Sequence, residues 1–369
     1  MKLALGKMKV LLNTAVVGSM VLALTACGGG TAADKPADQS SPQPAATKSA
    51  EGQKLVIYTG RDKNVVDVVI PKFKEKNPGI EVEFLTMGAQ QILERVRGEK
   101  ANPQGDFWWG GTQSALMTAA DEDLLKSFKP SFADSIDPTH KDAKDRWYGE
   151  MLLPEVIMYN PTAMKKEDAP KDWDDLLDPK YKDKIIIRGV LASGTMRTIY
   201  SAMIHRQGAA DPAKGYEWLK KLDANTKEYA QDPTNLYLKL ARQEGSLSLW
   251  NLQDIMLQKE TKNQPFDFIY PTSGAPILVD GVGMIKGGKN EEAAKKFYEF
   301  LFEPTLRAEL AEKLYQIPTR SDLKKETLPA WLKGLELKQL PLDWSVMASK
   351  EKEWMDYWDQ SIKGKGAKK

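Results

Sequence analysis

The chain has 369 residues, of which 41% are hydrophobic and 28% are charged, and its formal net charge at pH 7 is +2. This near-neutral globular composition gives no electrostatic reason to expect nucleic acid or an anionic surface as a partner. The chain contains two histidines and one cysteine. These counts argue against a histidine-based metal centre, a histidine-dependent catalytic triad and an internal disulfide, so we expect no metal and no cofactor.

The N-terminal residues predict a secretory leader. Three lysines precede a short apolar stretch over residues 10–24, which is shorter than the roughly 20 apolar residues that span a bilayer and suits a signal peptide. The stretch ends in Leu-Thr-Ala-Cys, which looks like a bacterial lipobox. We expect a signal peptide at 1–26, a lipid on Cys27 that anchors the chain to the extracytoplasmic face of the cell membrane, and a disordered tether at 27–53. An ordinary secreted protein, with Cys27 near the cleavage site by chance, is the alternative.

The segment that follows alternates between strands and helices. An apolar run at 55–58 predicts a strand, and the apolar positions of 64–76 share one helical face. Three more elements are predicted in order: a strand at 80–84, a helix at 90–100 and a strand at 106–109. A Gly-Gly-Thr turn then leads into another helix. This order predicts a parallel sheet with helices on its faces. Trp108 and Trp109 alternate on the third strand, so one should be buried while the other is free to face a cleft.

A second run of the same kind occupies the rest of the chain. Further strands are predicted at 185–187, 246–250, 266–270 and 277–285, and further helices at 193–203, 216–222, 237–243, 290–302 and 304–315. Near the end, Trp354, Tyr357 and Trp358 lie at helical spacing. Such a stripe predicts a closing helix that packs on the core rather than an aromatic binding box.

Several short segments carry a family resemblance through their order and spacing. They include Gly-Asp-Phe-Trp-Trp-Gly-Gly at 105–111, Pro-Lys-Asp-Trp-Asp-Asp-Leu-Leu at 170–177 and Ser-Gly-Thr at 193–195, with others at 55–60, 79–82, 154–161, 271–276, 280–282 and 317–320. The chain resembles the extracellular solute-binding proteins of ABC transporters that have the type II periplasmic-binding-protein fold. Within that fold it is similar to the branch that includes the ferric-ion-binding proteins.

The resemblance implies an α/β protein of two lobes, joined by two crossover strands near 155–160 and 270–278 and followed by a C-terminal helical segment. The first lobe would comprise 54–157 plus 275–369, and the second 158–274. The implied protein is a monomer that captures a small solute between its lobes and delivers it to an ABC permease and ATPase. A lipoprotein that presents its ligand to a membrane histidine kinase is an alternative.

An extracellular enzyme is disfavoured by the motifs. The sequence contains no Gly-x-Ser-x-Gly, no His-Glu-x-x-His and no complete phosphate-binding loop Gly-x-x-x-x-Gly-Lys-Ser/Thr. The acidic residues within 172–178 suit a helix start, where carboxylates favour the dipole, better than a catalytic dyad. We therefore expect a binding protein and not an enzyme.

Ligand contacts are expected where strands end and helices begin, because free amides there favour anions. Arginines nearby could make bidentate contacts to a carboxylate or phosphate. A solvated arginine, a helix cap and a core tryptophan are the alternative roles for these positions. The candidates are Gly60, Arg61, Gly111, Thr112, Ser193, Gly194, Thr195, Arg197, Trp250 and Asn251.

The ligand is expected to be anionic. Ferric-binding relatives clamp the metal with two adjacent tyrosines, and this chain has no Tyr-Tyr pair. A solute with phosphate, phosphonate or carboxylate fits the candidate contacts better, and ferric iron or a ferric chelate is the alternative.

Overall fold

The computed structural model describes residues 53–208 and 210–366. The predicted signal peptide, Cys27 and the predicted tether up to residue 52 lie outside these residues. The strands are β1 (Gln53–Thr59), β2 (Ile80–Thr86), β3 (Phe107–Thr112), β4 (Leu125–Lys126), β5 (Tyr148–Tyr159), β6 (Ile185–Arg188), β7 (Thr226–Ala230), β8 (Leu247–Asn251), β9 (Asp267–Ile269), β10 (Ile277–Ile285) and β11 (Ile317–Pro318). The helices are α1 (Lys63–Lys76), α2 (Ala89–Gly98), α3 (Gln113–Asp121), α4 (Gly194–Gly208), α5 (Ala213–Asn225), α6 (Pro233–Ala241), α7 (Leu252–Lys262), α8 (Glu291–Leu301), α9 (Pro304–Leu314), α10 (Ala330–Lys333) and α11 (Trp344–Ser361).

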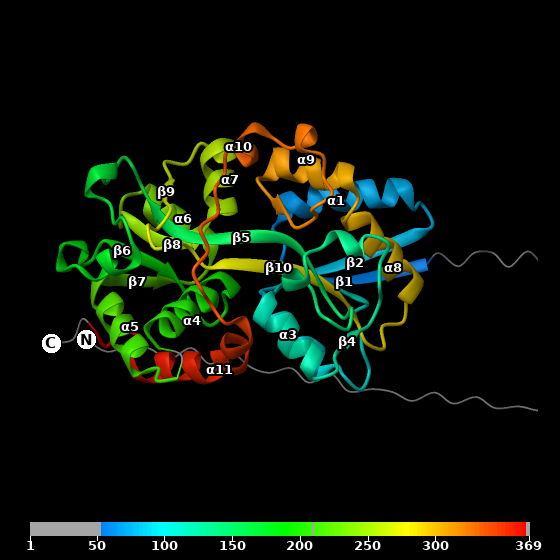
Figure 1. Cartoon of the computed structure of the whole chain (residues 1–369), viewed down its shortest axis with the longest axis horizontal. Coiled ribbons are helices and arrows are strands. Elements are labelled where there is room, and N and C mark those ends of the chain that lie inside the picture. Colours follow the sequence, from blue (N-terminus) through cyan, green and yellow to red (C-terminus); the bar gives the residue numbers. More distant parts are fainter. Residues whose placement is uncertain (1–52, 209, 367–369) are drawn as a thin grey trace, which may run out of the picture. The chain divides into compact units, whose positions relative to one another are not determined.

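The strands follow the order β2-β1-β3-β10-β5-β8-β6-β7 (Figure 1). In the first half, β1 pairs in parallel with β2 and β3, which confirms the predicted strand–helix order. β10 then pairs antiparallel with β3. The predicted turn at 110–112 is wrong, because β3 continues to Thr112 opposite Asp280 and α3 begins only at Gln113.

β5 connects the two halves of the sheet. Its earlier residues pair with β10, and its last five pair with β8 from Glu155↔Asn251 to Tyr159↔Leu247. β6 pairs in parallel with β7 and β8, so the carboxyl ends of β6 and β8 point back toward the first half. β5 and β10 run side by side across the middle of the molecule (Figure 1).

Helices cover both faces of β3, so the two tryptophans of this strand are both buried. Trp108 and Trp109 each have no exposed surface. Trp109 packs edge-on against Phe297 of α8, with ring centroids 5.5 Å apart, and Trp108 joins the apolar cluster that contains Leu116 of α3. The expectation that one of the two could face a cleft is therefore wrong, because helices lie on both sides of this strand.

The C-terminal helix forms as predicted. Trp354 and Trp358 of α11 are buried, and Trp358 meets the ring of Tyr200 in α4 edge-on at 5.3 Å. Residues 275–369 were predicted to belong to the first lobe, whereas α11 shares the apolar cluster of β6, β8 and α4. It also contacts α3, so it touches both halves of the molecule.

Within residues 53–208 and 210–366, no helix is both long and apolar enough to cross a bilayer.

Candidate functional site

A cavity of about 280 Å³ lies between the two halves of the sheet. It adjoins the residues that follow β1 and β3 in the first half and β6 and β8 in the second. Its walls comprise Gly60, Arg61, Asp62, Val65, Thr86, Met87, Gly88, Ala89, Gly110, Thr112, Met151, Leu153, Arg188, Ala192, Ser193, Gly194, Thr195, Pro233, Trp250, Asn251, Gln253, Asp254, Leu257, Leu278 and Asp280. This is the carboxyl edge of the parallel strands, where open α/β sheets bind ligands.

Six helices begin at this cavity. Each has its N-cap or its first residue in the wall: Asp62 for α1, Gly88 for α2, Thr112 for α3, Gly194 for α4, Pro233 for α6 and Asn251 for α7. The side chains of Thr112, Ser193 and Asn251 each accept a bond from an amide three residues on, at 3.3, 3.3 and 2.8 Å. In α4, the amides of Gly194 and Thr195 donate to no other group of the described chain. These free amides carry the positive end of the helix dipole.

The two halves touch at glycines beside the cavity. A Cβ added to Gly88 would lie 2.7 Å from the carbonyl oxygen of Ala192. A Cβ added to Gly194 would lie 2.4 Å from the Thr112 methyl group. Both distances are shorter than a normal van der Waals contact. At Gly88 the opposing atom belongs to the backbone and cannot rotate away, so glycine at this position permits the observed closure.

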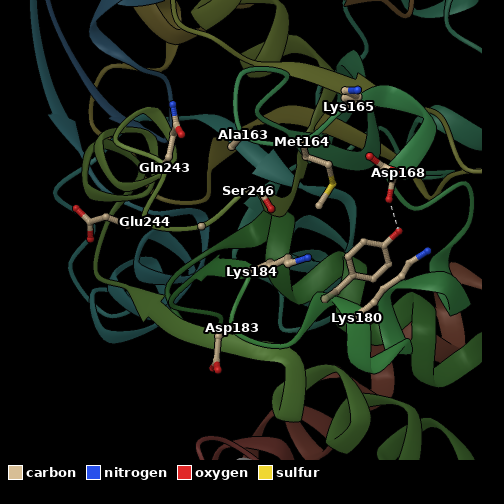
Figure 2. A pocket seen from close by; sticks show the side chains of 12 residues that line it. Ala163, Met164, Lys165, Asp168, Lys180, Asp183, Lys184, Gln243, Glu244 and Ser246 are labelled. Atoms are coloured by element: carbon tan, nitrogen blue, oxygen red, sulfur yellow. Dashed lines mark hydrogen bonds between the residues drawn. The ribbon is translucent and has the colours of Figure 1, made fainter.

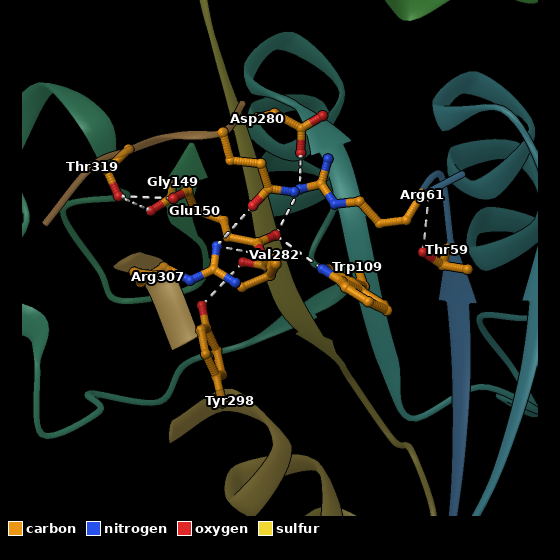
Figure 3. Close-up of polar contacts among 11 residues, drawn as sticks. Thr59, Arg61, Trp109, Gly149, Glu150, Asp280, Val282, Tyr298, Arg307 and Thr319 are labelled. Carbon is orange, nitrogen blue, oxygen red and sulfur yellow. Dashed lines mark hydrogen bonds and ion pairs between the residues drawn. The ribbon is translucent and has the colours of Figure 1, made fainter. Parts of the chain in front are cut away.

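Arg61 is held in an internal ion network (Figure 3). Its Nη2 lies 2.6 Å from Glu150 Oε2 and 2.6 Å from Asp280 Oδ1. Glu150 also accepts a bond from Trp109 Nε1 at 2.9 Å and pairs with Arg307 at 2.7 Å. Burial raises the pKa of Asp280 to about 6, although Arg61 opposes that shift. The positive charge of Arg61 is therefore largely neutralised by Glu150 of β5 and Asp280 of β10, and it links these two strands.

Arg188 is the other guanidinium of the wall, and the sequence analysis missed it. It is half-buried at the end of β6, and its guanidinium group forms no ion pair or hydrogen bond to any residue of the described chain. Burial lowers the pKa of Arg188, although Tyr237 and Asp254 oppose the shift. The reasoning that selected Arg61 could have found it, since Arg188 directly follows the predicted buried strand 185–187.

Asp254 collects the polar groups at the end of β8. Its Oδ2 accepts bonds from Trp250 Nε1 at 3.0 Å and from Asn251 Nδ2 at 2.9 Å. Burial and the nearby Asp62 raise the pKa of Asp254 to about 6. Trp250 is 2% exposed, so its ring is mostly core while its edge fixes this carboxylate.

Eight of the ten predicted contacts lie in the cavity wall. They are Gly60, Arg61, Thr112, Ser193, Gly194, Thr195, Trp250 and Asn251. Gly111 is not among them, because its surroundings are the side chains of Leu116 and Trp108. Arg197 is also absent, because its guanidinium bonds Glu351 of α11 at 2.9 and 3.2 Å.

A larger hollow of about 580 Å³ lies elsewhere on the second half (Figure 2). Ser246 directly precedes β8 and Lys184 directly precedes β6, so this hollow is at the amino ends of those strands. Its charged residues are mixed, with Lys165 and Lys184 near Asp168 and Glu244 (Figure 2). No described helix of eight residues or more begins among its lining residues. The smaller cavity therefore offers the better binding chemistry.

No group of three or more His, Cys, Asp or Glu side chains in 53–208 and 210–366 is placed to hold a metal ion. No tyrosine belongs to the described cavity wall.

Comparison with known proteins identifies the family. Residues 110–343 match the family described as bacterial extracellular solute-binding protein. The iron uptake protein A1 of Synechocystis is 27% identical over 320 residues, which are 83% of each chain. A periplasmic protein of Salmonella typhimurium assigned to 2-aminoethylphosphonate binding is 27% identical over 255 residues, 67% of this chain and 72% of the relative.

A solved structure of a periplasmic binding protein has the same fold. The periplasmic binding protein AfuA of Actinobacillus pleuropneumoniae, with exogenous fructose-6-phosphate bound, aligns with a TM-score of 0.74 and 26% identity over 84% of this chain and 98% of that one. The predicted two-lobed α/β fold is thereby confirmed, whereas the division of residues between the lobes stays a prediction. Because the family match spans more than half of the sequence, the chain belongs to the bacterial extracellular solute-binding proteins.

Proposed function

We propose that this protein is the ligand-capturing component of an ABC importer and that it binds a small phosphorylated or otherwise anionic solute in the cavity between its lobes. The observation that carries the proposal is the meeting of six helix starts with the unpaired guanidinium of Arg188 at one cavity. Free amides at helix starts and a guanidinium are the groups that bind phosphate or carboxylate most directly.

The size of the cavity supports a small solute. Its volume of about 280 Å³ lies near the lower end of small-molecule pockets, which commonly enclose about 300–1,000 Å³. The relative that contains fructose-6-phosphate and the relative assigned to 2-aminoethylphosphonate binding support a phosphate or phosphonate group. Binding without chemical conversion fits the solute-binding family.

Ferric iron is the second candidate, because one relative is an iron uptake protein. Bare Fe(III) needs hard anionic oxygens in number, and no metal-holding acidic group and no tyrosine occurs at the described cavity wall. A ferric chelate with free carboxylates would instead meet the same amides and Arg188 as a phosphate.

Calorimetric titration of the purified protein decides between these ligands. The probes are inorganic phosphate, fructose-6-phosphate, 2-aminoethylphosphonate, ferric citrate and ferric chloride. We expect micromolar or tighter binding of at least one phosphorylated or phosphonate probe. If ferric citrate or ferric chloride bound and no phosphorylated or phosphonate probe did, the proposal would be wrong and iron capture would be favoured.

We further propose that a lipid on Cys27 holds the protein at the extracytoplasmic membrane surface beside its permease. The support is the lipobox-like sequence that ends at this only cysteine. Wild type is expected in the membrane fraction, and Cys27→Ser in the soluble extracytoplasmic fraction. Equal distribution of both would contradict anchoring. If neighbouring genes encoded a histidine kinase instead of a permease, the sensor alternative would be favoured.

A further inference from the structure

The cavity wall has more negative than positive side chains. Three aspartates line it against two arginines. Arg61 is already paired with Glu150 and Asp280, so it does little for the remaining acids. Asp62 and Asp254 are left with Arg188, which lies within Coulombic range but forms no ion pair with either. A purely anionic ligand would add further negative charge to this wall.

Glu155 adds a buried carboxyl that forms no ion pair within the described chain. Its side chain is 0% exposed, and neither carboxylate oxygen makes a hydrogen bond to the described chain that meets normal geometry. Met151 and Leu153 of the same strand line the cavity. Because strand side chains alternate between faces, Glu155 lies on the face that Leu153 presents to the cavity. It also stands directly opposite Asn251 of the wall in the strand register.

The environment of Glu155 joins it to the cavity rather than to the core. Burial raises the pKa of Glu155 well above its usual range, and Asp254 and Asp280 raise it further. Both aspartates line the cavity, and the hydroxyl of Thr195, another wall residue, lies near the Glu155 carboxyl. Burial without an ionic partner therefore favours the neutral acid in the empty cavity. A ligand group that supplied positive charge here would lower the pKa of Glu155 and allow the carboxyl to ionise against it.

An ammonium group on the ligand would neutralise the excess negative charge of this wall better than a sugar hydroxyl or a metal ion would. It brings one positive charge and three hydrogen-bond donors, enough to serve Asp254 and a neighbouring acid at once. A sugar hydroxyl could donate to a carboxylate but would leave the charge uncompensated. A metal ion would need a set of acidic ligands that the described residues do not form.

We infer that the ligand is a zwitterion: its phosphate or phosphonate binds at the helix starts and Arg188, and its ammonium group binds at Asp254 in front of Glu155. The substrate class is therefore an amine-bearing organic phosphate or phosphonate. This inference rests on the proposed function, since it assumes that the anionic group binds in the same cavity.

Matched pairs of probes test the ammonium group alone. O-phosphoethanolamine is compared with 2-hydroxyethyl phosphate, and glucosamine-6-phosphate with glucose-6-phosphate, by calorimetry at pH 7.5. We expect the amine to bind at least tenfold more tightly than the alcohol in one pair. Asp254→Asn and Glu155→Gln should each reduce that ratio at least threefold. Asp67→Asn, on the exposed face of α1, is the control and should leave the ratio unchanged.

The outcomes separate this inference from the proposed function. If amine and alcohol bind equally, or the alcohol binds more tightly, the zwitterion inference is overturned while the phosphate site stands. If no phosphorylated or phosphonate probe binds, the proposed function fails and the inference fails with it. If a divalent or ferric ion must be present before the alcohol binds, the acidic wall serves a metal and the ammonium assignment is wrong.

Discussion

Substituting Gly88 by alanine tests whether the observed approach of the two lobes is the ligand-binding state. The new Cβ would lie 2.7 Å from the Ala192 carbonyl oxygen, about 0.7 Å closer than an ordinary contact. Ala192 presents a backbone atom, so no side chain can rotate away. The local backbone tolerates alanine, because Gly88 has φ −64° and ψ 151°. The substitution therefore acts on closure and not on the folding of α2.

The expected loss follows from the size of that clash. Overpacking by one methyl group costs roughly 1–3 kcal/mol, which corresponds to a weakening of ligand binding by about 5- to 150-fold. Calorimetry with O-phosphoethanolamine gives the affinity, and small-angle scattering gives the compaction on binding. Gly98→Ala is the matched control, since it lies in the same helix and its Cβ would meet nothing within 4 Å. Equal affinities of the two variants would refute the view that closure at Gly88 is coupled to binding.

Three further predictions concern charges. Arg188→Met should weaken binding of phosphorylated probes by roughly 10- to 100-fold, because a charge-assisted hydrogen bond is lost; Arg242→Met, at an exposed arginine, should not, and titration of both decides. Because the pKa of Asp254 is raised to about 6, lowering the pH from 7 to 5 should protonate it and remove the charge that attracts an ammonium group. The affinity ratio of O-phosphoethanolamine to 2-hydroxyethyl phosphate should therefore fall over that range in wild type and stay flat in Asp254→Asn; a flat ratio in both would contradict the assignment. Arg197→Met should cost about 3 kcal/mol of unfolding free energy, because it leaves Glu351 buried without its partner, while ligand affinity stays within twofold; a loss of affinity in a folded Arg197→Met protein would return this residue to the binding site.

Sequence patterns were sufficient to predict a strand or helix where one hydrophobic periodicity dominated the segment. Isolated apolar runs such as 55–58 and 185–187 became β1 and β6, and their carboxyl ends became cavity walls. β7 was missed because Thr-Lys-Glu-Tyr-Ala has too few apolar residues to show a strand period. α7 was missed because its apolar and polar residues give little contrast between faces.

The fate of each arginine could not be read from local sequence. Arg61, Arg188 and Arg197 all lie near the carboxyl end of a strand or the start of a helix. Arg61 is taken up by Glu150 and Asp280, which are 89 and 219 residues away in sequence, and Arg197 by Glu351, 154 residues away. Only the tertiary fold decides which guanidinium is left for a ligand, and it leaves Arg188.

The position of β10 has a consequence for the way this chain folds. β10 lies between β3 and β5. The strand β3, which ends at Thr112, is therefore paired on both sides only after β10, which contains Asp280, has been synthesised. Pairing over such separations is slow, because a long loop must close before any contact rewards it. A nascent chain that ends before Ile277 would leave two strand edges bare, which favours aggregation. The first half of the sheet therefore cannot be completed until β10 has been synthesised, so the chain must extend to Ile285 of its 369 residues before either edge is protected.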